Sequence, residues 1–126
     1  MKEMIARLVL AALGLMGAAL FAVTWFDLPR FTRLLGPEAP TALAAASLRA
    51  DAGGFFAAWA TGALLAAINR DRRWAVLPLL MLGFAFAGRL FTYVQTPDAT
   101  IVSPMVTEAV LFVIVWLARQ GLPVRA

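Results

Sequence analysis

Four long runs of apolar residues, separated by polar connections, dominate this chain. The first run, Leu8 to Phe26, contains no charged residue, and as a helix it would be about 28 Å long, close to a bilayer core of about 30 Å. Three similar runs follow at Ala52 to Ile68, Trp74 to Tyr93 and Ile101 to Ala118. The pattern predicts an all-α, integral membrane four-helix bundle that forms a single transmembrane domain over residues 1–126.

The connection over residues 27–49 is the only long one, and we expect it to form an outer-side loop. Its first half mixes arginines with apolar residues, as an interfacial segment does. After Pro40 an alanine-rich stretch favours a helix, so the second helix is expected to begin near Thr41 and to project beyond the membrane. We place the four spans at about residues 5–26, 50–69, 74–94 and 101–118.

Lysine and arginine are distributed unevenly between the two sides of the predicted bundle. One side carries Lys2, Arg7, Arg70, Arg72, Arg73, Arg119 and Arg125, and the other carries Arg30, Arg33 and Arg49. Cytoplasmic segments of membrane proteins are enriched in these two residue types. The ratio of seven to three therefore predicts that both termini are cytoplasmic.

The amino-acid composition indicates a membrane protein and excludes several kinds of functional site. Hydrophobic residues make up 63% of the chain and charged residues 14%, whereas soluble domains contain about 25% charged residues. Because the chain has no cysteine and no histidine, disulfides, Cys/His zinc sites, haem ligation by these residues and histidine-based catalysis are excluded. We expect no metal, no cofactor and no enzymatic activity. The net charge of +4 is scattered over loops and helix ends, which favours membrane lipids over nucleic acid as partners.

Small residues recur at every fourth position along the second span. Small side chains let helix backbones approach closely, which drives helix association in lipid. We interpret this stripe as a packing seam inside the bundle, with an interface to a second copy or to a larger membrane complex as the alternative. The stripe consists of Gly54, Ala58, Gly62 and Ala66.

Two opposite charges, Arg89 and Glu108, interrupt spans that are otherwise apolar. A charge inside a membrane is costly unless it has a partner or a function. Both residues are predicted near the outer surface at similar depths, and the Cα–Cβ tilt of the two antiparallel helices turns their side chains toward each other. Tyr93 shares the face of Arg89, Asp51 is expected at the same level on the second helix, and Arg49 lies close by on a different face.

These five residues allow three interpretations. Arg89 and Glu108 can form a structural salt bridge, or the cluster can line an outer-side pocket for a lipid headgroup or small polar ligand, or it can act as a proton or ion relay. We therefore predict a small non-catalytic membrane protein with a charged cluster near its outer face. The alternative is an accessory subunit that packs against a larger membrane complex, and a small transporter is the third possibility.

Several of these residues also resemble a known family. Arg49 to Gly54, Gly88-Arg89, Pro97-Asp98 and Glu108 are similar to the small bacterial four-helix membrane proteins catalogued as domain of unknown function 4345. The resemblance covers nearly the whole chain in length and span layout, and it implies a multi-pass protein of the bacterial cytoplasmic (inner) membrane. It brings no established activity. The family has glycine after the turn aspartate, where this chain has Ala99. The positions that typify the family pattern are Arg49, Gly53, Gly54, Arg89 and Glu108.

Overall fold

Five helices make up the computed structural model, which describes residues 1–124. They are α1 (Lys2–Phe26), α2 (Leu28–Leu35), α3 (Ala42–Asn69), α4 (Val76–Gln95) and α5 (Ala99–Gln120). The described residues contain no strand. Four of the helices, α1, α3, α4 and α5, are long and apolar enough to cross a membrane. The structure thus confirms an all-helical protein with four candidate membrane spans.

The connection over residues 27–49 is more ordered than a loop, because it contains α2 and the start of α3. The helix α3 begins at Ala42, beside the predicted start, because the hydroxyl of Thr41 accepts the backbone N–H of Ala44 and so caps the helix. Compared with the predicted span, α3 is therefore longer by about two turns at this end.

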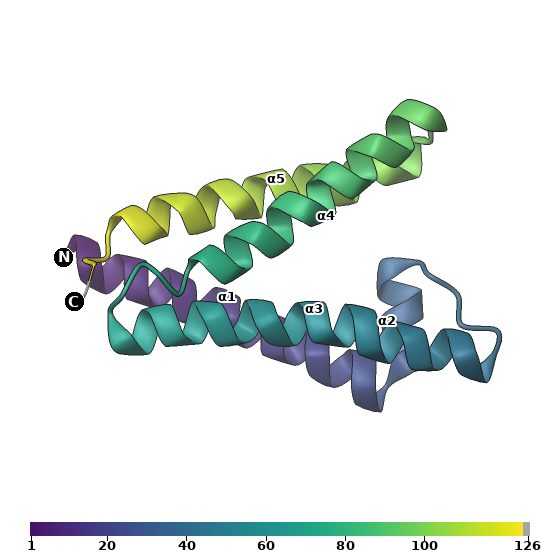
Figure 1. Ribbon diagram of the computed structural model, residues 1–126, viewed down its shortest axis with the longest axis horizontal. Coiled ribbons are helices and arrows are strands. Elements are labelled where there is room, and N and C mark those ends of the chain that lie inside the picture. Colours follow the sequence, from purple (N-terminus) through teal and green to yellow (C-terminus); the bar gives the residue numbers. More distant parts are fainter. Residues whose placement is uncertain (125–126) are drawn as a thin grey trace.

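The short helix α2 folds back onto the longer helices (Figure 1). It begins after Asp27, whose carboxylate accepts the backbone N–H of Arg30, and it ends at Gly36, which adopts a left-handed φ of 89°. Phe31 is 2% exposed and packs edge-on against Phe56 of α3, with 6.2 Å between the ring centroids. The segment predicted to be interfacial is thus a helix anchored by an aromatic contact.

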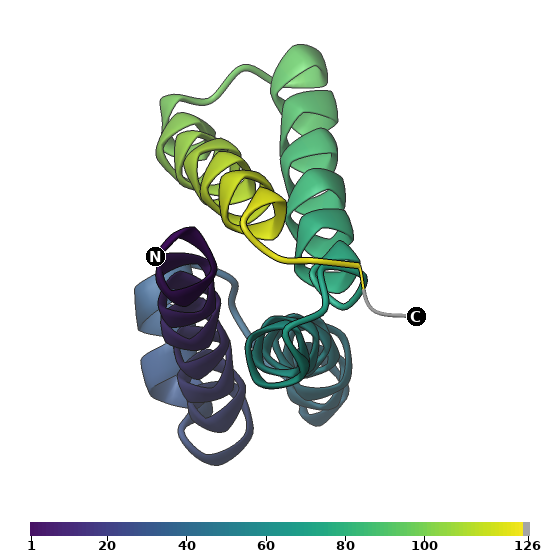
Figure 2. The same ribbon diagram turned by 90° about the vertical axis from the view of Figure 1, so that its left-hand side faces the viewer.

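The four long helices form two antiparallel pairs that meet at one end of the molecule (Figures 1 and 2). Packing is most extensive between α1 and α3 and between α4 and α5, and contacts of α3 with α4 and of α1 with α5 join the pairs. The buried residues of α4 and α5 are Pro78, Leu82, Val115 and Ala118. All four lie in the halves of these helices that are close to the end of the molecule where the two pairs meet (Figure 1). The other halves diverge, so the predicted four-helix bundle is open at one end.

Because the helix pairs diverge, one half of the predicted small-residue stripe on α3 is buried and the other half is not. Gly62 and Ala66 are buried, and a Cβ added at Gly62 would lie 2.6 Å from the Cβ of Leu77 in α4. Ala58 is half-buried, and Gly54 is exposed, with no atom within 4 Å of an added Cβ. Only the half of the stripe near the meeting point of the two helix pairs therefore forms an internal seam.

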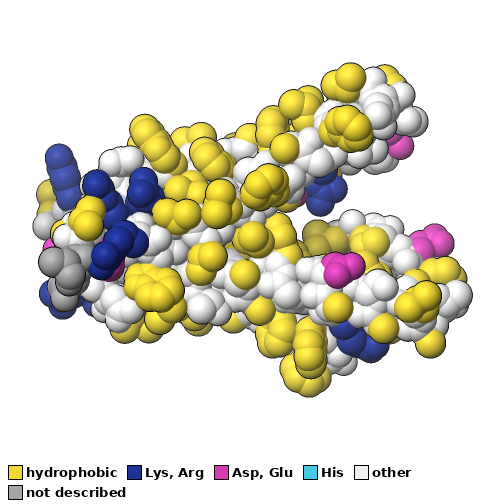
Figure 3. Space-filling view, viewed as in Figure 1, with side chains coloured by type: hydrophobic (Ala, Val, Ile, Leu, Met, Phe, Trp, Pro, Cys, Tyr) yellow, Lys and Arg dark blue, Asp and Glu magenta, His cyan; other side chains and the backbone are white. Residues whose placement is uncertain are grey.

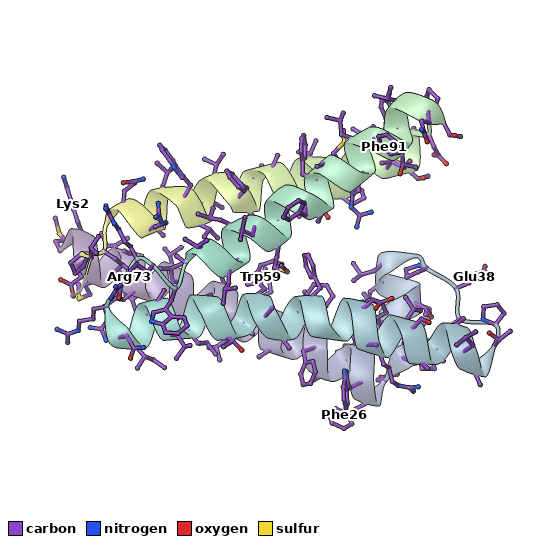
Figure 4. The ribbon with its side chains drawn as sticks, viewed as in Figure 1. Lys2, Phe26, Glu38, Trp59, Arg73 and Phe91 are labelled. Atoms are coloured by element: carbon purple, nitrogen blue, oxygen red, sulfur yellow. The ribbon has the colours of Figure 1, made fainter. Side chains whose placement is uncertain are left out.

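Basic residues gather where the helix pairs meet, and we call this the basic end of the molecule (Figure 3). Arg7 donates from Nε to the carbonyl of Ala67 at 2.9 Å, and Arg119 donates from Nε to the carbonyl of Arg72 at 3.2 Å. Arg125, which was counted with this group in the sequence, lies outside the described residues. The group otherwise consists of Lys2, Arg7, Arg70, Arg72, Arg73 and Arg119; Figure 4 labels Lys2 and Arg73. We call the opposite, open end the far end.

Candidate functional site

An ion pair joins α4 to α5 in the far half of the molecule. The Nε of Arg89 donates to Oε1 of Glu108 at 2.7 Å. The carboxylate side chain is 13% exposed, whereas the arginine side chain is 42% exposed. The structure thus brings together the two charges that were predicted to converge.

Helix geometry explains why these two residues meet. Arg89 lies about 9 Å before the end of α4, and Glu108 lies about 14 Å after the start of α5, so the two Cα atoms differ somewhat in height. In α4 the Cα–Cβ bond leans toward the basic end, and in the antiparallel α5 it leans toward the far end. The two side chains therefore lean toward each other and close the offset.

The ion pair uses only part of the hydrogen-bonding capacity of its two members. A guanidinium group has five N–H donors, but in the described structure Arg89 donates only from Nε. Oε2 of Glu108 is buried and has no hydrogen-bond partner among the described residues. An unsatisfied buried acceptor typically costs about 1–3 kcal/mol. By contrast, Arg73 donates to Asp71 from both Nε and Nη2.

A pocket of about 310 Å³ opens beside Arg89. An added Cβ at Gly88 would meet no atom within 4 Å, so the absence of a side chain there keeps the pocket open. The hydroxyl of Thr92 donates to the carbonyl of Gly88 at 3.0 Å, which leaves lone pairs on the hydroxyl oxygen free to accept. The lining residues are Phe84, Ala85, Gly88, Arg89 and Thr92 of α4 and Ile101 of α5.

The pocket lies on the helix pair α4–α5, in the part of the molecule where the two pairs are apart. Figure 3 shows a hollow between the far halves of the pairs, with a basic side chain on the α4–α5 side. The site therefore combines a cation that has unused donors, a neutral acceptor and apolar walls. Such a combination suits a ligand with both a polar, negatively charged part and an apolar part.

Of the five residues of the predicted cluster, only Arg89 lines this pocket, and Glu108 lies behind it as its ion-pair partner. Arg49 contacts α1 instead, because its Nε donates to the carbonyl of Trp25 at 3.2 Å. Asp51 is exposed and forms no hydrogen bond or ion pair with the described residues. Tyr93 is half-buried and lies outside the lining. The divergence of α3 from α4 at the far end explains why the residues of α3 are not at the site (Figure 1).

Phe84 and Ile101 of the lining were not singled out from the sequence, and Gly88 was quoted only for the family resemblance. Gly88 directly precedes Arg89 and Phe84 lies five residues before it, so both are turned by about 100° or more from the arginine, and helical spacing from Arg89 alone does not find them. Ile101 belongs to α5. Its position depends on how α5 packs on α4, which the spacing within one helix does not report.

The fold and this site define a helical protein with four candidate membrane spans and a charged pair beside a pocket. Comparison with protein-family models, with curated proteins and with solved structures gave no match to the chain. The similarity to domain of unknown function 4345 therefore rests on the residues quoted above and stays a prediction. Among the described residues, no group of three or more Asp, Glu, His or Cys side chains is arranged to hold a metal ion.

Proposed function

We propose that this protein is a non-catalytic, multi-pass protein of the bacterial inner membrane that binds a lipid headgroup or a small polar molecule beside Arg89. One observation carries the proposal: Arg89 lines a pocket while its terminal nitrogens have no partner in the described structure. Glu108 contacts only Nε and so holds the guanidinium by its inner side. The outer edge of a guanidinium matches a carboxylate or phosphate with two parallel N–H groups.

The distribution of charge supports an orientation with the basic end in the cytoplasm. In that orientation both ends of the described chain are cytoplasmic, and the pocket beside Arg89 lies toward the outer face. A binding site near the outer face is accessible to lipids of the outer leaflet and to molecules outside the membrane.

Two glycines offer a matched pair of substitutions for testing ligand binding. Neither Gly88 nor Gly54 has an atom within 4 Å of an added Cβ, so the described packing tolerates a side chain at both positions. Gly88→Leu fills the pocket, whereas Gly54→Leu lies on α3, outside the lining. Wild type and variants would be purified in mild detergent, and native mass spectrometry would identify bound molecules.

The wild type and Gly54→Leu are expected to retain a copurifying molecule, and Gly88→Leu and Arg89→Gln are expected to lose it. Circular dichroism would show that all four proteins keep their helices. Retention of the same molecule by both Gly88→Leu and Arg89→Gln would contradict the proposal, because it would place the ligand elsewhere.

A second candidate function is that of an accessory subunit that docks on a larger membrane complex, or on another copy, through α3. The exposed Gly54 favours it, because a glycine with free space around it allows another helix to approach closely. Gly54→Leu would then release the protein from its complex, which native gels of gently solubilised membranes would show as faster migration. Unchanged migration would count against docking at this position.

A further inference from the structure

Two polar groups follow one another along the pocket, from Arg89 toward the far end. Arg89 provides unused N–H donors. Thr92 lies about 4.5 Å further along α4, and because its proton is donated to Gly88, its oxygen can only accept from a ligand. The pocket thus presents donors at one level and an acceptor at the next level toward the far end.

A carboxylate continues this order beyond the pocket. Asp98 is the N-cap residue of α5 and lies three residues before Ile101, which lines the pocket. Its Oδ1 accepts the backbone N–H and the hydroxyl of Thr100, and Oδ2 makes no hydrogen bond with the described residues. The hydrogen bonds from Thr100 lower the pKa of Asp98, so this exposed group is negatively charged at neutral pH.

Charge balance restricts the ligand. Arg89 and Glu108 neutralise each other, so a purely anionic ligand would bring an uncompensated negative charge into a site lined by Phe84 and Ile101. A ligand that carries its own positive charge avoids this cost. The order of the polar groups places the negative part of such a ligand on Arg89 and its positive part nearer the far end.

Apolar surface continues from the pocket in the other direction. Leu80, Phe84 and Gly88 are spaced by four residues and share one face of α4. Leu80 is 47% exposed and Phe84 is 71% exposed. A molecule with its polar part at Arg89 can therefore lay hydrocarbon chains over this face toward the basic end. A phospholipid has this arrangement, whereas a water-soluble zwitterion has no group to cover Phe84 and Leu80.

We infer that the pocket binds a zwitterionic phospholipid with a phosphoethanolamine headgroup. Its phosphate binds the terminal nitrogens of Arg89, its ammonium group lies toward Thr92 and Asp98, and its acyl chains cover Phe84 and Leu80. This inference rests on the proposed function and adds the class of ligand to it. A primary ammonium has N–H donors for Thr92 and Asp98, and a phosphoglycerol headgroup lacks the positive charge.

A competition between two lipids tests the headgroup. The purified protein would be equilibrated with micelles that contain equal amounts of phosphatidylethanolamine and phosphatidylglycerol with the same acyl chains, and native mass spectrometry would count each bound lipid. Wild type is expected to prefer phosphatidylethanolamine by about fivefold, the modest ratio that one exposed charge contact gives. Asp98→Asn preserves a good helix cap and removes the charge, so its preference should fall to about one. Asp51→Asn removes an exposed carboxylate outside the pocket, and its preference should equal that of wild type.

The outcomes separate this inference from the proposed function. If Arg89→Gln and Gly88→Leu retain as much of both lipids as wild type, the proposed function and the inference both fail. If wild type retains the two lipids equally and Gly88→Leu retains neither, the proposed function stands and the headgroup inference fails. Displacement of bound lipid by soluble glycerophosphoethanolamine at the same concentration as intact phosphatidylethanolamine would overturn the assignment to a lipid.

Discussion

Trp25 and Arg49 exchange hydrogen bonds between α1 and α3. The indole N–H of Trp25 donates to the carbonyl of Arg49 at 3.1 Å, and Nε of Arg49 donates to the carbonyl of Trp25 at 3.2 Å. Gly53, one turn along α3, makes room for the ring, because an added Cβ would overlap the indole nitrogen. The exchange fixes the end of α1 to the far half of α3 and accounts for the position of Arg49.

Gly53→Ala is expected to destabilise the protein by about 1–3 kcal/mol, because the new methyl group displaces the indole of Trp25 from a tight contact. The free energy of unfolding, measured in mixed detergent micelles, would show this. The adjacent Gly54→Ala is the control, since its added Cβ meets no atom, and helix propensity alone should stabilise it by up to about 1 kcal/mol. Equal effects at the two glycines would contradict the contact.

Loss of Arg89 is expected to cost more stability than loss of the charge on Glu108. Arg89→Gln leaves a carboxylate that is only 13% exposed without its charged partner, at a cost of about 1.5–3 kcal/mol. Glu108→Gln leaves an arginine that is 42% exposed and can reach water or headgroups, at a cost of about 1 kcal/mol or less. Unfolding in mixed micelles measures both costs. Equal costs, or the reverse order, would show that the carboxylate is not the more isolated partner.

Acid is expected to weaken the start of α5. The backbone N–H of Thr100, and then its hydroxyl, lower the pKa of Asp98 below its ordinary value of 3.8. Because the folded-state pKa lies below the unfolded value, the stabilisation by Asp98 is present above about pH 4 and is lost as the pH falls through the folded-state pKa. The uncharged cap of Asp98→Asn does not titrate. Melting temperatures at several pH values should therefore converge in acid, and a constant difference between the two proteins would contradict the prediction.

The proposed orientation predicts which ends of the helices are accessible from outside the cell. The chain has no cysteine, so a single cysteine can be placed at the exposed Glu38, labelled at the far end in Figure 4, or at the exposed Asn69 near the basic end. A membrane-impermeant maleimide should label Glu38→Cys in intact cells. Asn69→Cys should react only after permeabilisation, and labelling in the opposite order would invert the orientation.

Much of the helical architecture could be predicted from the sequence, because an uninterrupted apolar run such as Leu8 to Phe26 matches the bilayer thickness as a helix, in which its backbone groups pair with one another. The pairing of Arg89 with Glu108 was also predictable, because it depends on helix rise, chain direction and a short turn. These quantities depend on local geometry, and they do not require the packing of distant helices to be known.

The predicted positions of Arg49 and Asp51, both on α3, depended on packing between distant helices. Asp51 was placed by height alone, but height does not specify how far α3 stands from α4, and the two helices diverge at that level (Figure 1). Phe31 illustrates the same limit, because its burial against Phe56 turns a segment with scattered arginines into an anchored helix. Neither the divergence nor this aromatic contact follows from the apolar pattern of one span.

The divergence of the two helix pairs also makes the molecule a wedge. The far halves stand apart (Figure 1), so in the proposed membrane orientation the protein would take up more lateral area in the outer leaflet than in the inner one. Lipids must deform around the wider part, at a modest elastic cost of the kind known for hydrophobic mismatch. The elastic cost is smaller where the membrane bends so that the leaflet on the wider side expands. We therefore expect the protein to concentrate in regions of that curvature.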